Sequence, residues 1–355
     1  MRYFSLFFLF IISIATKAQQ RLEYGNFLQL DKEIQWSAIY HSVLNLTPVN
    51  PNYDIWKFYE RKLSSGPVSI YIPDSSTFAV ERMQVKYAEY MAGISKIPFD
   101  AQEMNWKYDF ADGNNTAESI FRNERSTCDS CFLDGKFSLM KVKQLIYYKN
   151  HQLYVQNVLL QPVFYTKTDY PERDNAKFYI GDAIAFNDSL TNNTIPAKAI
   201  FICRTSNLLN LSSLTKNENR VLTNYNHNLS LILYKDIKKD HIHAYNTESS
   251  LIPGTKYLKK DSLDYYHNPV IEVPVFDSTG IIVGNKFIFS EINFDSIYHY
   301  SLIQDIYFDF TKEILYSKVV ALVPFMNVIT SAGVDLGLAP YWGVDFKRRK
   351  IQKKK

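Results

Sequence analysis

The sequence predicts an α+β fold of two related units, each with short helices packed on an antiparallel sheet that contains a long β-hairpin. The segment 306–325, IYFDFTKEILYSKVVALVPF, reads as two apolar strands joined by a turn. The segment 145–164, LIYYKNHQLYVQNVLLQPVF, has the same pattern. Amphipathic stretches typical of short helices precede both hairpins, and 26 Tyr with 24 Phe favour sheets.

The N-terminus predicts a secretory signal peptide over residues 1–18. Arg2 precedes an apolar run over residues 3–14, and small residues at Thr16 and Ala18 predict cleavage after Ala18. A membrane anchor is the alternative, but about twelve apolar residues are short for a span that needs roughly 20. No later segment approaches that length, so we expect a soluble product in a periplasm or outside the cell.

The first unit, residues 19–195, is expected to contain three helices and a hairpin. Apolar residues recur at three-to-four spacing over 33–46, 53–63 and 78–94, which predicts a helix in each segment. Residues 68–73 read as a short strand, and the polar, Asn-rich residues 100–135 read as a loop. The hairpin follows, with strands over 137–148 and 153–164.

The second unit, residues 196–346, repeats part of this order. The boundary falls in the polar, turn-forming stretch 191–199. The later elements are expected as a helix over 228–237, strands over 241–245, 287–294, 301–310 and 314–325, and a last edge strand over 341–346. Residues 280–284 read as a turn between strands. Past Lys318 both faces of the 314–325 strand are apolar, which predicts cover on both sides.

Charge is uneven along the chain. The net charge is +4, but the last nine residues, KRRKIQKKK (347–355), carry seven positive charges. This basic tail suits a solvated chain end, or contact with anionic lipid or an acidic partner. Because the body has no basic stripe and the chain is expected to be exported, we expect no nucleic-acid partner.

The three cysteines predict no metal site. Cys128 and Cys131 form a CxxC in a polar stretch, and an oxidising compartment favours a short local disulfide between them. A redox role would need an activated thiolate at a strand-to-helix junction, which the surrounding sequence does not suggest. Cys203 is then left buried or unpaired. A zinc site would need a second pair at ligand spacing.

No residue pattern predicts catalysis or a cofactor. His241 and His243 are two apart, so on a strand they share one face and could start a metal site with a distant carboxylate. Because no third ligand is near in sequence, two histidines on a half-exposed strand are the simpler interpretation. We therefore predict no catalytic, cofactor-binding or metal-binding residue, and no enzyme.

Four aromatic residues predict protein contacts. Trp106 and Tyr108 lie in a polar loop, and Tyr341 and Trp342 lie at the chain-end strand. Aromatic residues in such places often anchor interfaces. Packing in the core is the alternative for each of them.

The segments Tyr307-Phe308-Asp309 and 317–324, with Tyr341-Trp342, resemble the gliding-motility family GldN, also called PorN. Trp36 and residues 55–71 are similar to the family as well, whereas residues 41–45 depart from its pattern. The resemblance implies two GldN-like units and a periplasmic, non-enzymatic subunit of the type IX secretion machinery of Bacteroidota. It also implies a ring with an outer-membrane lipoprotein and other subunits, with self-contacts as a further expectation.

The alternative function is a secreted enzyme or ligand-binding protein with its site between the two units, where clefts often form.

Overall fold

The part of the chain that the structure describes is a large antiparallel sheet with two short helices, which confirms the α+β class. The computed structural model describes residues 33–73, 80–86, 139–166, 177–187, 194–211, 220–221, 228–247, 250–254, 256–263, 270–289, 292–329 and 335–347. Its helices are α3 (Ile55–Ser65) and α6 (Leu229–Lys238), with 3-10 turns η1 (Pro51–Tyr53), η5 (Lys260–Ser262) and η6 (Phe294–Ser296).

Twelve strands form the main sheet, in which β10-β16-β14-β5-β4-β1-β9 is the longest path. Off this path, β13 joins β14 to β8, β15 pairs with β14, and β6 and β7 pair with β5. The strands are β1 (Ile34–Asn45), β4 (Leu139–Lys149), β5 (Gln152–Thr166), β6 (Lys177–Ile180), β7 (Ala185–Phe186), β8 (Ile200–Asn210), β9 (Arg220–Val221), β10 (His243–Asn246), β13 (His299–Asp309), β14 (Ile314–Ile329), β15 (Asp335–Pro340) and β16 (Trp342–Asp345).

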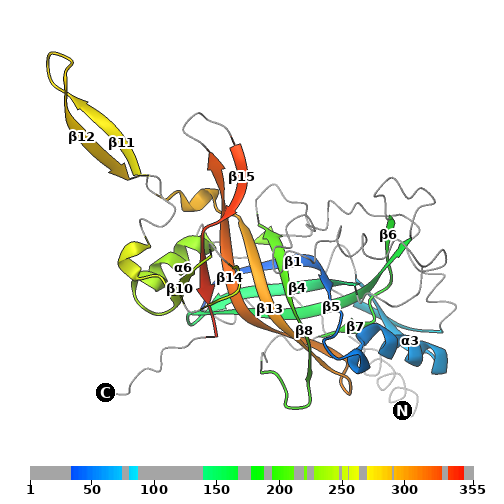
Figure 1. Ribbon diagram of the computed structural model, residues 1–355. Coiled ribbons are helices and arrows are strands. Elements are labelled where there is room, and N and C mark those ends of the chain that lie inside the picture. The colour runs from blue at the N-terminus through cyan, green and yellow to red at the C-terminus, as the bar shows by residue number, and fades with distance from the viewer. Residues whose placement is uncertain are drawn as a thin grey trace, which may run out of the picture.

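The main sheet has two layers whose strands cross. In Figure 1, β1, β4 and β5 run across the direction of β8, β13 and β14. Where the layers meet, β5 pairs with β14 only through Gln156 and Tyr316. Two smaller sheets, β2 (Val68–Pro73) with β3 (Val80–Val85) and β11 (Val270–Phe276) with β12 (Ile282–Phe289), complete the described strands.

The two long hairpins share one register. In β4–β5 the pairing shifts at Val158, and in β13–β14 it shifts at Val320, so each hairpin has one extra residue at this place. Pro162 and Pro324 follow these bulges at the same distance. The strand order β1-β4-β5-β7 also matches β8-β13-β14-β16. The unit boundary at 195 and 196 stays a prediction.

Side-chain amides join the two layers. The Gln144 amide nitrogen donates to Gln304 Oε1 at 3.2 Å, and the Asn207 amide nitrogen donates to Ser42 Oγ at 2.9 Å. Gln144 and Gln304 occupy equivalent places, each beside the bulge of its hairpin, and both are fully buried. Because a buried amide loses its hydration, these hydrogen bonds favour one arrangement of the layers over others.

Two predicted helices are wrong in the described residues. The segment predicted as a helix over 33–46 is strand β1, which pairs along its length with β4. Trp36, Ala38 and Tyr40 pack into one core cluster and Ile39 into another, so both faces are buried. Burial of both faces produced an apolar spacing that imitates a helix. In the predicted helix over 78–94, Val80–Val85 form β3, and residues 87–94 lie outside the described part.

The other predicted helices are confirmed. Helix α3 begins after Asp54, whose carboxylate accepts from the Lys57 N–H, and α6 begins after Asn228, whose side chain accepts from the Ser230 N–H. Helix α3 buries its apolar face, Ile55, Trp56, Tyr59 and Leu63, against the main sheet. Both long hairpins and the strand over 68–73 are also confirmed, and β14 is buried on both faces past Lys318 as expected.

The segment 341–346 is not an edge strand. Strand β16 pairs with β10 on one side and with β14 on the other, so it lies inside the sheet. The turn expected at 280–284 begins earlier, since β12 starts at Ile282 and the turn occupies residues 277–281. The expected loop over 100–135 lies outside the described residues.

Acid is expected to destabilise this fold through His41. This residue is on β1 and lies opposite Lys143 of β4. Burial, and then Lys141 and Lys143, lower the pKa of His41 to about 3. Because an unfolded histidine titrates near 6.5, the unfolded state binds more protons between these values. Stability is therefore complete above about pH 6.5 and falls by up to about 1.4 kcal/mol per pH unit below it.

Urea unfolding at pH 7, 6 and 5 measures this effect. His41→Gln should flatten the slope of unfolding free energy against pH. Some slope should remain, because burial also lowers the pKa of His299. An unchanged slope in the variant would contradict the assignment to His41.

Candidate protein-binding site

The hairpin β11–β12 is the most exposed apolar element among the described residues. Its two strands pair with each other and with no other described strand. It extends away from the rest of the protein (Figure 1, upper left). Five of its large apolar side chains whose burial the structure describes are 41% to 64% exposed: Val275, Phe276, Ile281, Ile282 and Val283. Contiguous exposed apolar surface of this kind marks a site of protein or membrane contact.

Hydrogen bonds to Asp277 hold the end of the hairpin in one shape. One carboxylate oxygen accepts from the Thr279 N–H at 2.8 Å, the Thr279 hydroxyl at 2.6 Å and the Ile281 N–H at 3.0 Å. These bonds, the Thr279 hydroxyl first, lower the pKa of Asp277, so its carboxylate is charged at neutral pH. Gly280 has φ +83°, which glycine adopts without strain. The apolar side chains beside the turn are thus presented by an ordered backbone.

The backbone of this hairpin suits strand addition. An isolated two-stranded hairpin is marginally stable in water, and its outer edges present unpaired N–H and C=O groups. Pro274 removes one donor from β11. A strand of another protein could pair with an edge while its side chains cover the apolar face.

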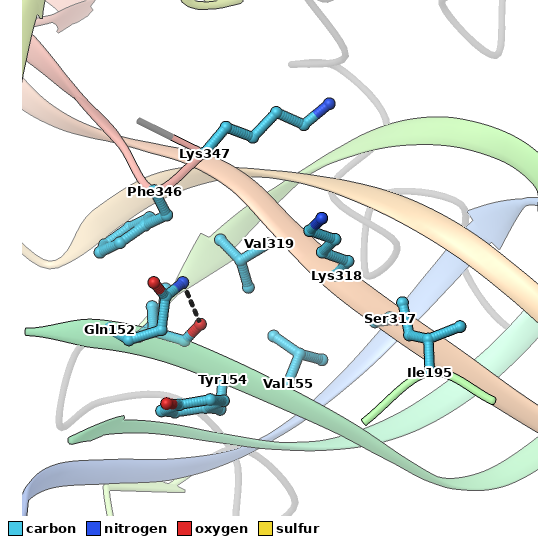
Figure 2. Close-up of a pocket in the computed structure, with 10 residues that line it drawn as sticks. Gln152, Tyr154, Val155, Ile195, Ser317, Lys318, Val319, Phe346 and Lys347 are labelled. Carbon is cyan, nitrogen blue, oxygen red and sulfur yellow. Dashed lines mark hydrogen bonds between the residues drawn. The ribbon is translucent and has the colours of Figure 1, made fainter. Parts of the chain in front are cut away.

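A pocket of about 320 Å³ lies where β5 meets β14. Figure 2 shows Val155 and Val319 facing each other in its floor, with Phe346 at one end and Ile195 near the other. This volume is at the lower limit of sites that hold small molecules. The pocket lies between the two layers of the sheet. The alternative function, a ligand site between two units, would require a pocket in this position.

The polar groups of the pocket are already engaged or face solvent. The Asn157 amide nitrogen donates to Ser317 Oγ at 2.9 Å, and Lys347 Nζ lies 2.9 Å from Asp305 Oδ2. Burial alone would raise the pKa of Asp305, but hydrogen bonds from Arg204 and Lys347 outweigh burial and lower it. The ten lining residues include no histidine, cysteine or carboxylate that could act on a ligand.

Two of the predicted contact residues are buried. Tyr341 and Trp342 are 0% exposed and pack in the core between the sheet layers and α6. Both residues therefore pack in the core, which was the alternative interpretation for them, because β16 is an inner strand. Trp106 and Tyr108 lie outside the described residues, as do Cys128 and Cys131. Cys203 is a buried free thiol, and burial, followed by Asp305, raises its pKa to about 12.

His241 and His243 do not share a site. The His243 ring lies 6.0 Å from the Tyr257 ring, centroid to centroid. His241 instead lies beside Asp236 and His151. Sequence reasoning missed His151 because it belongs to a hairpin turn 85 residues from Asp236. It also missed the exposed apolar surface of β11–β12, although the cluster of apolar residues around a Gly-containing turn, VPVFDSTGIIV, indicates such a surface.

The fold and its protruding hairpin define a sheet protein with a candidate protein-binding site. Residues 211–350, about two fifths of the chain, match the family model of GldN, described as a gliding motility associated protein. The match confirms the resemblance to GldN over this part.

The matched part begins directly after β8, ends at residue 350, and includes α6, β11–β12 and β13 to β16. No curated protein and no solved structure matches the chain. Among the described residues, none of the helices has the length and apolar character to cross a bilayer.

Proposed function

We propose that this protein is a structural, non-enzymatic subunit of a type IX secretion or gliding-motility complex that binds partner proteins through the β11–β12 hairpin. It acts in the periplasm, exported by the signal peptide expected over residues 1–18. Its partners are an outer-membrane lipoprotein of a ring and other subunits, with contact between copies of this chain as a further use of the same surface.

The exposed hairpin is the observation that carries this proposal. Water exposure of five large apolar side chains at one end of the molecule is unfavourable, by roughly 25 cal/mol for each Å² of apolar surface. A partner that covers them recovers this free energy. The GldN match includes the hairpin and supports the class of complex.

The hairpin replaces Tyr341 and Trp342 as the proposed contact surface. Trp106 and Tyr108 stay proposed contacts, and the basic tail over 347–355 stays a proposed contact with the membrane surface. The proposal assigns no chemical step to the chain.

A charged residue on the hairpin is expected to disrupt assembly without unfolding the protein. Ile282→Asp replaces an apolar side chain that is 59% exposed with a charged carboxylate. In cells, the tagged variant should lose co-purification with the outer-membrane lipoprotein and elute as a small species in size-exclusion chromatography. Wild type should elute as a large assembly.

Val49→Asp is the matched control. Val49 is 75% exposed on the loop after β1, so this change adds the same charge to another exposed apolar position. It should leave the assembly intact. The proposal fails if Ile282→Asp retains the lipoprotein as wild type does, or if both variants lose it equally. Self-association through the hairpin would instead show as an Ile282-dependent oligomer of the purified chain without the lipoprotein.

A further inference from the structure

We propose that His151, Asp236 and His241 form a binding site for a divalent transition-metal ion, with zinc as the preferred ion. The three side chains each offer one ligand atom, and these atoms lie within 4.8 Å of one another. His151 Nδ1 lies 2.7 Å from Asp236 Oδ2, and His241 Nδ1 lies 3.2 Å from Asp236 Oδ1. The two imidazole rings are in contact, with centroids 3.9 Å apart.

The site joins two parts of the fold that are distant in sequence. His151 is in the turn of the β4–β5 hairpin, and Asp236 is in the last turn of α6. Figure 1 shows α6 next to the end of the β4–β5 hairpin. An ion here would therefore link the hairpin turn to the helix.

The donor set selects a borderline transition metal. Two imidazole nitrogens and one carboxylate oxygen are common ligands of zinc. Calcium and magnesium prefer oxygen ligands throughout. Zinc bonds of about 2.0–2.2 Å place tetrahedral ligand atoms roughly 3.3–3.6 Å apart. The two His–Asp separations, 2.7 Å and 3.2 Å, are shorter than this spacing, so these ligand atoms would move apart around an ion.

A hydrogen bond from Tyr148 orients the Asp236 carboxylate, as is common for metal ligands. Tyr148 is fully buried, and its hydroxyl donates to Asp236 Oδ2 at 2.5 Å. Such a second partner fixes the orientation of a ligating carboxylate.

The histidine side chains face solvent on their outer side. They are 43% and 39% exposed, whereas the Asp236 side chain is 9% exposed. An ion could therefore enter from solvent. A water molecule, or a side chain of a partner, could complete a fourth position on the open side.

The backbone around the site adopts conformations that most residues avoid. Four non-glycine residues in the described part have positive φ, and three of them are a ligand or precede one in sequence: Asn150, His151 and Asp240. Asn150 and His151 form a two-residue hairpin turn in which Asn-Gly is the usual choice. A histidine in place of that glycine supplies a side chain at the cost of strain.

The turn after α6 has the same character. Asp240 has φ +61°, where helix ends usually carry glycine, and the His241 N–H donates to the Asp236 carbonyl at 2.9 Å. This turn reverses the direction of the chain after α6, so that the His241 side chain lies beside the Asp236 carboxylate. Strained turns thus place both histidines against one buried carboxylate.

Zinc titration of the purified full chain without a histidine tag tests the site. After treatment with a chelator, wild type should bind one Zn²⁺ by calorimetry, and its Tm should rise by several degrees. Mg²⁺ at the same concentration should leave the Tm unchanged. Co²⁺ should give the visible absorption of a four-coordinate site.

The variants His151→Asn and His241→Asn each remove one ligand. Asparagine tolerates positive φ, so His151→Asn should keep the hairpin turn. Each should bind Zn²⁺ at least tenfold more weakly and lose the Tm rise. His243→Gln is the matched control, because it removes a nearby histidine outside the site, and it should behave as wild type.

Two results would overturn the proposal. One is a wild-type chain with no zinc-dependent rise in Tm. The other is an equal response of wild type, His151→Asn and His241→Asn, which would show adventitious zinc binding only. Neither result depends on the secretion partners, so the test is independent of the proposed function.

Discussion

Trp342→Ala is expected to lower the free energy of unfolding by about 3–5 kcal/mol, the usual range for loss of a buried aromatic residue. Trp342 is 0% exposed, and its ring lies 5.9 Å from that of Tyr341, centroid to centroid. The indole packs in the core cluster that holds β16 against α6 and the sheet. Urea unfolding of the purified chain measures the loss.

Trp342→Phe is the control for this change. The indole N–H has no hydrogen-bond partner among the described residues, so phenylalanine removes an unpaired donor and keeps an aromatic ring. We expect a loss clearly smaller than that of alanine. If Trp342→Ala instead leaves stability unchanged and weakens binding to the lipoprotein, Trp342 is a contact residue and the core assignment is wrong.

Gly343→Ala is expected to destabilise the protein by the upper part of the range of about 1–3 kcal/mol that overpacking costs. A Cβ at this position would lie 2.1 Å from Cζ of Tyr245, its cross-strand partner on β10. The Tyr245 ring is fully buried and its hydroxyl donates to the Leu251 carbonyl, so the ring cannot move away easily.

Gly254→Ala is the matched comparison. A methyl group added at Gly254 would meet none of the described atoms within 4 Å, so this change should alter stability by less than about 0.5 kcal/mol. In a double-mutant cycle, Tyr245→Ala combined with Gly343→Ala should cost less than the two single changes added together. Full additivity would show that the ring and the glycine do not interact.

The long hairpins and the two helices could be predicted because their signals are local. Strand pairs with a short turn, and a capping residue such as Asp54 or Asn228 before an apolar face, are properties of neighbouring residues. The failure at β1 has a non-local cause. Whether residues 34–45 form a strand depends on β4, which lies about a hundred residues later and supplies a partner along the whole length.

The candidate sites were harder to predict for the same reason. A turn near Gly280 is visible in sequence, but the exposure of Phe276 and Ile282 depends on which other strands pair with the hairpin, and none of the described strands does. Trp342 was expected at an edge because the chain ends nearby, whereas β10 covers that side. The contact of His151 with Asp236 follows from the packing of α6 against a hairpin turn and has no sequence signature.

The pairing of strands across the two parts of the chain has a consequence for the segment that resembles GldN. That segment begins at residue 211, directly after β8, yet β8 forms one whole side of β13. An isolated fragment of residues 211–350 would lack β8, which pairs with β13, and β5, which pairs with β14. The family-like segment is thus an inseparable portion of a larger folding unit, and dissection of this protein should preserve the chain from β1 onward.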